Sequence, residues 1–396
     1  MILRRIIILF LWSLSSPVWA ADRYASPAGA GTTCSTGTPC SLNTALSQAV
    51  AGEHVILKNG TYQSTLNTIR SGAPGNPIVI RAENAQQAIV EPPTTWTPGN
   101  LAVSPPTQGS GQYVRILHSN ITLREIVFDG DDRTYNMILV LGDEATNTTC
   151  ASLIQNIIIE EIISREPQVA HLAMRCVKNA IVRHNLFTSV IATEGLYIGK
   201  HQLTVENLQF YGNTMEDAGS NSLDFKTAVL NADIHHNIVQ RQHKGDIVAQ
   251  DGNVTFEGRG HHFHNNIIRN GATASGSAIL DYVYLWANHN IHDNVFHDMP
   301  VPHLLWYQTN PTPIATSKFE NNTMCNTGTV IQKRSTSGSS STPDGLTQSG
   351  NLVNQAQAVC DAEVTRIINE MATLPRWDDG LVIDAPNALT VVSITD

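Results

Sequence analysis

Four basic residues lie close together in an otherwise acidic chain. Lys226, Arg241, Lys244 and Arg259 follow one another, although the whole sequence has 24 Lys and Arg against 34 Asp and Glu, a net charge of −10. That overall sign disfavours nucleic acid and anionic lipid, so the local cations indicate a specific anionic ligand. Guanidinium and ammonium groups bind carboxylates, and aromatic rings beside them stack on sugars. We therefore predict a monomer that binds an anionic polysaccharide, with no nucleic-acid or membrane partner.

The residues that would form this site come from strand-like segments that follow variable loops. Side chains alternate between the two faces of a strand, so stacking these segments brings their outward residues into columns. One column would hold Tyr197 with Asp224, and another Lys226 with Gln250, Tyr282, Tyr307 and Lys333. The inward column of the same segments would be Leu196, Leu223, Ile247, Ile279, Leu304 and Val330. The predicted substrate-binding residues, from these columns and the adjacent loops, are Tyr197, Lys200, Arg241, Lys244, Gln250, Trp306 and Tyr307.

Lys226 is the predicted catalytic base. A free Lys titrates near 10.4, so it acts as a base only where neighbouring cations or burial lower its pKa. Arg241, Lys244 or Arg259 would supply those cations, and we expect Arg259 to contribute to catalysis in this way. Tyr282 is the predicted proton donor or an alternative base. The competing interpretation of Lys226 is an ordinary surface residue paired with Asp224.

The element that would position these side chains is a repeat marked by Asn. Asn185, Asn213, Asn237, Asn266, Asn294, Asn322 and Asn351 recur at spacings of 28, 24, 29, 28, 28 and 29 residues. Similar strand patterns without Asn lie around Ile126 and Ile162. This period, combined with strand-like alternation, indicates a solenoid. The chain lacks the repeated leucine frame of leucine-rich repeats, which argues against that alternative.

The repeat predicts an all-β fold, a single-stranded right-handed parallel β-helix of about ten coils. Stacked Asn amides would bond to one another at each corner. The core would be narrow, and no single coil could bury it alone. The expected inward residues precede each Asn by three or follow it by two: Val182, Phe210, Ile234, Phe263, Ile291, Phe319, Phe187, Met215, Val239, Ile268, Phe296 and Met324.

The two ends of the chain have their own signals. Residues 1–20 have a basic start and a short apolar run, which predicts a signal peptide and a secreted protein, extracellular or periplasmic. Residues 21–396 are predicted to be one β-helix domain, with an N-terminal cap and first coil over residues 22–60. A short helix there, capped by Ser41 or Asn43, would cover the open end of the core. A second capping helix is expected over residues 361–374.

Six Cys in an exported chain suggest disulfides. Cys34 is near Cys40, Cys150 is about one coil from Cys176, and Cys325 with Cys360 would tie the tail to the last coils. These pairs are three of several possible connectivities. No CxxC or HExxH spacing supports zinc.

The chain resembles secreted right-handed β-helix polysaccharide lyases of the pectate lyase-like superfamily. The resemblance rests on the Asn corners, the N-terminal cap and the segment Ser222–Thr227. That segment is similar to the D-D-G-[FW]-D strand motif of one pectate lyase group. The resemblance implies β-elimination on a uronate polymer, with Ca²⁺ on an acidic cluster. Asp224 matches the last Asp of that motif, whereas Ser220 and Asn221 replace its leading acids. The expected metal ligands are Asp224, Glu194 and Asp246.

Three other functions remain open. A glycoside hydrolase of the polygalacturonase kind would need paired carboxylates, which Asp224 with Asp246 or Glu194 could supply. A uronan C5-epimerase would share the first step of the lyase. A non-catalytic carbohydrate-binding solenoid would need only the aromatic residues between Tyr282 and Tyr307. Separately, His235, His264 and His292 would stack on another face, as a metal site or as a hydrogen-bonded row.

Overall fold

The structure is a computed structural model of the 396-residue chain. It describes residues 21–95, 112–134, 136–146, 148–190, 195–200, 203–216, 222–226, 228–240, 254–256, 260–269, 279–283, 288–299, 304–308, 317–327, 331–334 and 346–375. Of these, residues 112, 254–256, 279–283, 299, 304–308, 327, 331–334 and 346 are described by their strand positions alone. The predicted signal peptide, residues 1–20, lies outside the described residues.

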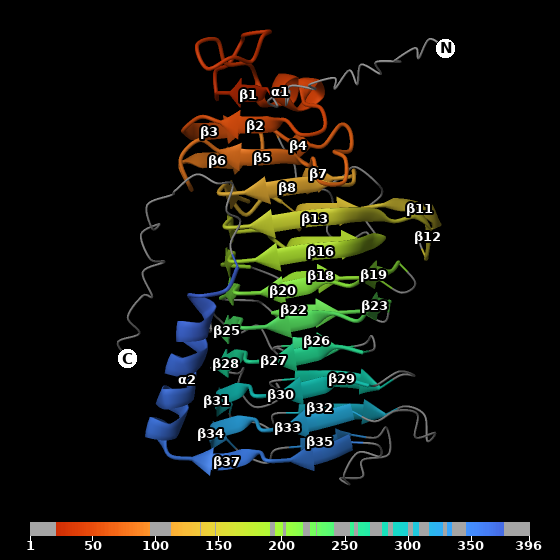
Figure 1. The fold of residues 1–396 in the computed structure, drawn as a ribbon, viewed down its shortest axis with the longest axis vertical. Helices are drawn as coiled ribbons and strands as arrows, with labels where there is room; N and C mark the ends of the chain where they lie inside the picture. Colours follow the sequence, from red (N-terminus) through yellow and green to blue (C-terminus); the bar gives the residue numbers. More distant parts are fainter. Residues whose placement is uncertain are drawn as a thin grey trace, which may run out of the picture.

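Within the described residues, three parallel sheets wind around one narrow core, and each coil contributes one strand to each sheet (Figure 1). Sheet A consists of β1 (Asp22–Ala25), β2 (His54–Leu57), β5 (Ile78–Ala82), β8 (Ile121–Arg124), β13 (Ile154–Glu160), β16 (Val177–Arg183), β20 (Gln209–Tyr211), β24 (Asp233–His235), β27 (His262–His264), β30 (Asn290–His292), β33 (Ser317–Glu320) and β36 (Leu346–Ser349). In addition, β19 (Val205–Glu206) pairs with β16, and β23 (Val229–Leu230) pairs with β19.

Sheet B consists of β3 (Gly60–Gln63), β6 (Ala88–Glu91), β9 (Val127–Asp129), β14 (Ile163–Arg165), β17 (Leu186–Thr188), β21 (Thr214–Met215), β25 (Ile238–Gln240), β28 (Ile267–Arg269), β31 (Val295–Met299), β34 (Thr323–Thr327) and β37 (Leu352–Gln355). Sheet C consists of β4 (Leu66–Asn67), β7 (Gln112–Ile116), β10 (Asn136–Leu141), β15 (Ala170–Arg175), β18 (Leu196–Ile198), β22 (Leu223–Phe225), β26 (Val254–Phe256), β29 (Ile279–Val283), β32 (Leu304–Gln308) and β35 (Ile331–Arg334). The predicted parallel β-helix is confirmed.

The predicted Asn column forms the corner between sheets A and B. Each Asn side chain donates from Nδ2 to the Oδ1 of the next, as from Asn237 to Asn266 at 2.9 Å and from Asn266 to Asn294 at 3.1 Å. The same Oδ1 accepts the backbone N–H of the preceding Asn, and Nδ2 also donates to a backbone carbonyl of the preceding coil, as from Asn266 to Ile234 O. All the predicted inward residues beside this column are buried, none more than 2 % exposed. Ile126 and Ile162 are also buried.

Each corner also needs a residue in the left-handed region. The position just before the Asn has positive φ in every coil from Glu125 to Gly350, including His184, His236 and Asp293. A second left-handed column, which the sequence analysis did not identify, marks the corner between sheets C and A. Its members are Asn120, Asn156, Asn179, Asn207, Asn231, Gly260 and Asn288. Asn tolerates this conformation better than other non-glycine residues, which explains its use in the column between sheets C and A.

The N-terminal cap is as predicted. Helix α1 (Leu42–Gln48) begins after Ser41, whose side chain accepts a hydrogen bond from Thr44 N at 3.2 Å. Its apolar face, Leu42, Ala45, Leu46 and Ala49, is buried against the first coil. The three suggested cysteine pairs are all formed: Cys34–Cys40, Cys150–Cys176 and Cys325–Cys360.

The C-terminal helix differs in position from the expected cap. Helix α2 (Gln357–Met371) lies along the flank of sheet B instead of across the end of the solenoid (Figure 1). Its residues Cys360 and Ile367 pack on Ile267, Val295 and Cys325, in a small core separate from the main one. The outward face of sheet B is apolar here, so the helix gains more burial on the flank than over the end.

A change of one corner Asn should weaken the whole stack. Asn266→Ala removes the two Nδ2 hydrogen bonds and the Oδ1 acceptor that neighbouring coils use, leaving buried groups without partners. We expect the free energy of unfolding to fall by about 2–3 kcal/mol in urea denaturation. Asn43→Ala is the control, because Asn43 is exposed on α1. Equal stability of the two variants would contradict a structural role for the amide stack.

Buried histidines should make the fold acid-sensitive. Burial lowers the pKa of His171 from 6.5 to about 3. Below about pH 6.5 the unfolded chain binds a proton at His171, whereas the folded chain does not. The stability present above about pH 6.5 is therefore lost as the pH falls toward 3. His171→Gln cannot titrate, and we expect it to lose about 2 kcal/mol less than the parent between about pH 7 and pH 5. His54→Gln, at a partly exposed position, is the control. Identical pH profiles for parent and His171→Gln would reject this account.

Candidate functional site

Most described residues of the predicted site lie on strands of sheet C or directly after them. Tyr197 on β18 lies directly beside Asp224 on β22, as strand alternation predicted. Tyr282 lies on β29 of the same sheet, opposite Tyr307 on β32. Asp224, Lys226 and Tyr282 therefore share one sheet, although more than fifty residues separate the first from the last.

Two cations flank the ring of Tyr197. Lys226 Nζ lies 5.1 Å from the ring centroid and Arg175 Cζ lies 6.0 Å from it. Arg175 ends β15 and Lys226 follows β22, so one whole coil separates the two residues. At the intervening position stands Gly199, with φ of +77°, where a Cβ would approach Val229 Cγ2 to 2.9 Å. This glycine leaves room for both long side chains to converge on one ring.

Asp224 is fully buried and forms an ion pair with Lys226, with Nζ and Oδ2 2.6 Å apart. A buried carboxylate at this distance favours the ammonium form of its partner. Lys226 is therefore better suited to neutralise a substrate carboxylate than to remove a proton. The structure does not test its predicted role as the base.

Lys200 has the electrostatic setting expected for a base. Burial lowers the pKa of its amine, and the positive charge of Arg175 lowers it further, while Glu144 acts in the opposite direction. Gly199 turns the chain just before it, and Leu203 N donates to its carbonyl oxygen at 2.8 Å. Lys200 was predicted to bind substrate; its environment also suits proton transfer.

Arg175 and Glu144 were missed in the sequence analysis. Glu144 lies on β11 (Asp143–Thr146), which pairs with β12 (Thr149–Ser152) in an antiparallel hairpin. Its Oε1 is 3.9 Å from Arg175 Nη1. Arg175 sits directly before a cysteine of a predicted disulfide, which was the available signal.

Two predicted strand registers differ in the structure. The strand opposite Leu223 is β26, which begins at Val254, so Val254 takes the place expected for Ile247. Beside β32, Ile331 takes the place expected for Val330. Several apolar pairs compete within each long loop, and alternation alone cannot choose among them. As a result Tyr307 pairs with Arg334, and Lys333 pairs with Trp306.

Several predicted site residues remain untested. Trp306 pairs with Asp281, and both continue the column of Phe225 and Phe256. Tyr307 pairs with Tyr282 in the neighbouring column. The remaining predicted residues lie outside the described part of the chain: Glu194, Arg241, Lys244, Asp246, Gln250 and Arg259.

The predicted calcium ligands do not form a cage in the described residues. Of the three, Asp224 alone is described, and its Oδ2 lies 2.6 Å from the ammonium of Lys226, a poor setting for a second cation. Across the described ranges, no group of three His, Cys, Asp or Glu side chains converges as a metal site. No step below therefore passes through a metal, and Ca²⁺ remains a prediction.

The histidine row lies on sheet A. The rings of Tyr211, His235, His264 and His292 stack at centroid distances of 4.8, 5.0 and 4.9 Å. His264 Nε2 is 3.2 Å from Asp233 Oδ1, and His292 Nδ1 is 2.7 Å from Asp293 Oδ2. These contacts are those of a hydrogen-bonded row, one of the two interpretations of the sequence.

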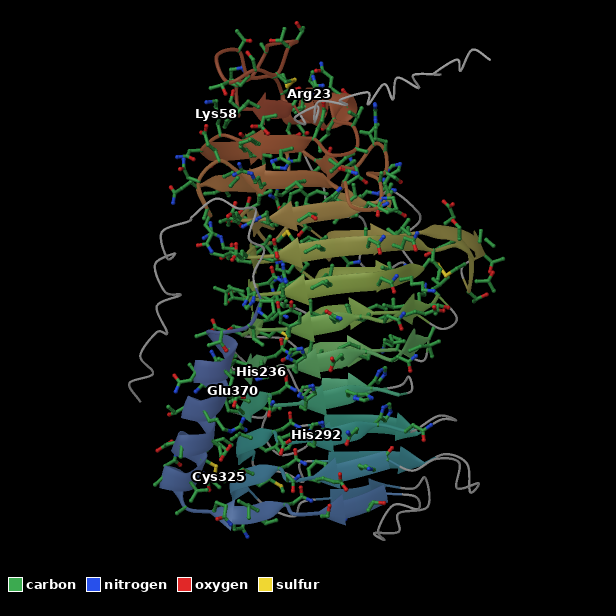
Figure 2. The ribbon with its side chains drawn as sticks, viewed as in Figure 1. Arg23, Lys58, His236, His292, Cys325 and Glu370 are labelled. Carbon is green, nitrogen blue, oxygen red and sulfur yellow. A yellow bond between two sulfur atoms is a disulfide. The ribbon has the colours of Figure 1, made fainter. Side chains whose placement is uncertain are left out.

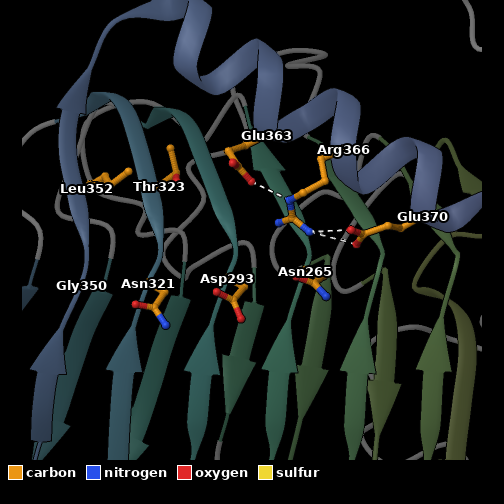
Figure 3. Close-up of a pocket in the computed structure, with 9 residues that line it drawn as sticks. All are labelled: Asn265, Asp293, Asn321, Thr323, Gly350, Leu352, Glu363, Arg366 and Glu370. Atoms are coloured by element: carbon orange, nitrogen blue, oxygen red, sulfur yellow. Dashed lines mark hydrogen bonds and ion pairs between the residues drawn. The ribbon is translucent and has the colours of Figure 1, made fainter.

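A cavity lies between α2 and the A–B corner (Figure 3). Its volume is about 480 Å³, and its lining includes Asp293, Glu363, Arg366 and Glu370. Arg366 donates to Glu363 at 2.7 Å and to Glu370 at 2.9 Å, which leaves the lining net negative. Glu370 also meets His236 Nε2 at 3.0 Å, beside the end of α2 (Figure 2). This cavity would repel a polyanion, so the sheet C face is the candidate site.

Comparisons with known proteins agree with the fold. A profile of the chondroitinase B family matches residues 38–95, the N-terminal cap and first coils. Pectate lyase Pel9A superposes with a TM-score of 0.60 at 13 % identity, over 83 % of this chain and 79 % of that one. A GH136 lacto-N-biosidase from Eubacterium ramulus superposes with a TM-score of 0.58 at 11 % sequence identity, over 85 % of this chain and 68 % of that one. A glycoside hydrolase superposes with a TM-score of 0.57 at 11 % sequence identity, over 87 % of this chain and 98 % of that one. No curated protein matches the sequence.

At these identities the likeness establishes the parallel β-helix that carbohydrate-active enzymes share, and not one activity. Neither helix of the described chain is long and apolar enough to span a bilayer.

The reactivity of Lys200 should depend on Arg175. Because the cation of Arg175 lowers the pKa of Lys200, Arg175→Gln should shift the pH midpoint of Lys200 acylation upward. Quantitative peptide mass spectrometry after brief acylation at a series of pH values measures that midpoint. Arg165→Gln, on sheet B, is the control and should leave it unchanged. An unchanged midpoint in Arg175→Gln would mean that the two groups are not coupled.

Proposed function

We propose that the protein is a secreted polysaccharide lyase that cleaves a uronate-containing polymer by β-elimination. The observation that carries this proposal is the convergence of Arg175 and Lys226 on the ring of Tyr197, with Lys200 beside Arg175. A sugar ring can stack on the tyrosine while its carboxylate meets one or both cations. The similarity to pectate lyase Pel9A in fold supports the same class.

The proposed reaction uses these groups in a defined order. Arg175 and Lys226 neutralise the C6 carboxylate, which makes the C5 proton more acidic. The neutral amine of Lys200 takes that proton. The C5–H electron pair then forms the C4–C5 double bond, and the C4–O4 bond breaks. Tyr282 remains the predicted donor of a proton to the departing O4.

The assignment of Lys200 as base revises the hypothesis for Lys226. The lowered pKa of Lys200 supports it, because more of its amine is neutral at a given pH. The ion pair with Asp224 supports Lys226 as a carboxylate-binding cation. Both residues remain in the site, with different tasks.

Secretion is part of the proposal. The three disulfides of the structure are typical of proteins exported to an oxidising compartment. The expected monomer and the predicted Ca²⁺ dependence also belong to the proposal, and they are testable by light scattering and by chelator titration. The acidic overall charge of −10 agrees with recognition through a local cationic site.

The activity test uses a panel of pectate, alginate, glucuronan and glycosaminoglycans. A lyase creates an unsaturated uronate, which absorbs in the ultraviolet, and we expect this signal on at least one polymer. Lys200→Met should lower kcat by about 100-fold or more with little change in melting temperature, because a general base is lost. Lys178→Met, a partly exposed residue of sheet A, is the matched control.

The same panel separates the alternatives. Reducing ends without ultraviolet absorbance would identify a hydrolase, and inversion at C5 without cleavage would identify an epimerase. Binding without any chemical change would identify a carbohydrate-binding solenoid. Full activity of Lys200→Met on a cleaved polymer would remove Lys200 from the proposed reaction.

A further inference from the structure

Hairpin β11–β12 is the antiparallel strand pair that interrupts the coils in the described part of the chain. It leaves sheet C after β10 and returns before β13, so it projects beyond the stacked strands (Figure 1). Solenoid coils without such an insertion turn directly from sheet C to sheet A. A projecting insertion beside one coil is where a solenoid can add a specific contact without disturbing its core.

Two kinds of contact tie this hairpin to the solenoid. Cys150 on β12 is bonded to Cys176, which is fully buried and stands directly after Arg175. At the root of the hairpin, a Cβ on Gly142 would come within 2.4 Å of Cys176 O and 2.7 Å of Ser152 O. Ser152 Oγ also donates to Asp143 Oδ2 at 2.7 Å, which closes the hairpin across its base. The hairpin is therefore attached at the residue next to Arg175.

The attachment places Glu144 against Arg175. The two side chains are mostly buried, with 13 % and 17 % exposed, and Glu144 Oε1 lies 3.9 Å from Arg175 Nη1. Arg175 extends from there toward the ring of Tyr197. This contact is an ion pair without a hydrogen bond. The attraction favours those conformations of the flexible guanidinium that remain near Glu144, so less freedom is lost when a substrate carboxylate binds it.

We propose that hairpin β11–β12 is a positioning arm of the substrate site, in which the Cys150–Cys176 disulfide holds Glu144 against Arg175 and so sets the affinity for the substrate carboxylate. This inference rests on the proposed function, because Arg175 is the carboxylate-binding group there. Glu144 is a positioning residue, since it acts through Arg175.

The location of this disulfide separates it from the other two. Cys34–Cys40 lies in the N-terminal cap, and Cys325–Cys360 joins α2 to sheet B. The first therefore lies outside the stacked coils, and the second fastens a helix to the flank of sheet B. Cys150–Cys176 instead lies among the middle coils, where parallel strands on both sides already hold β16 in place.

The test compares Glu144→Gln and the double variant Cys150→Ala/Cys176→Ala with two matched controls. Glu206→Gln makes the same change in the ion pair with Lys178 on sheet A, and Cys34→Ala/Cys40→Ala removes a disulfide far from the site. We expect KM for the cleaved polymer to rise about two- to five-fold in both test variants, with kcat nearly unchanged. Neither control should move KM.

A second readout does not require turnover. Glu144 raises the pKa of Lys200, so its removal or withdrawal should shift the pH midpoint of Lys200 acylation downward in both test variants. The direction is opposite to that expected for Arg175→Gln. A purely structural disulfide would lower the melting temperature without moving this midpoint.

The outcomes separate the two proposals. If no polymer is cleaved or bound, the proposed function fails. The pH midpoint of Lys200 acylation still shows in that case whether the hairpin positions Glu144 near Arg175 and Lys200. If Cys150→Ala/Cys176→Ala keeps the parental KM and midpoint, the positioning arm is rejected. If that variant does not fold, Glu144→Gln decides: a parental KM and midpoint there would equally reject the proposal.

Discussion

The structure depends on the register in which successive coils stack, and the Asn amides of the A–B corner hold that register. Each amide joins two neighbouring coils through its own donors and acceptor, so every corner is tied to the next. A slip of one residue would exchange inward and outward side chains along a whole strand. The convergence of Arg175, Tyr197 and Lys226 exists only because those coils are in register. The left-handed residue before each Asn makes the tight corner possible.

The sequence predicted those parts of the fold in which short-range chemistry repeats. The Asn column and its buried neighbours were recoverable because successive coils use the same residue type at the same place. The cysteine pairs were suggested by their separations along the chain. The second left-handed column was not recognised, since Asn120, Asn156 and Asn179 follow one another at uneven spacings. The strand containing Val254 was misplaced for a related reason: loop length varies between coils, and Ile247 offered an equally apolar alternative.

The site was only partly predictable. Strand alternation placed Tyr197 beside Asp224, and this pairing needs no knowledge of side-chain conformation. Arg175 was hidden because β15 is buried on both faces, so its residues show no alternation of apolar and polar side chains. Glu144 reaches Arg175 from an inserted hairpin. Arg175 contacts Tyr197 across a glycine position of the next coil, and the contact with Glu144 comes from an insertion. Such contacts depend on three-dimensional geometry that the pattern of residues along the sequence does not show.

A solenoid gives each sheet an outer face of its own, and this chain uses the three faces differently. Sheet B exposes an apolar column that α2 covers, with Cys325–Cys360 holding the helix in place. The cavity beside that helix is net negative. Around Tyr197 the described charges are three cations, Arg175, Lys200 and Lys226, against two carboxylates, Glu144 and Asp224, a net charge of +1. A polyanion approaching the molecule is therefore repelled from the helix flank and attracted to sheet C, and this attraction weakens as salt screens it. Because the main core and the α2 core are separate, the charge of one face can change without repacking the other.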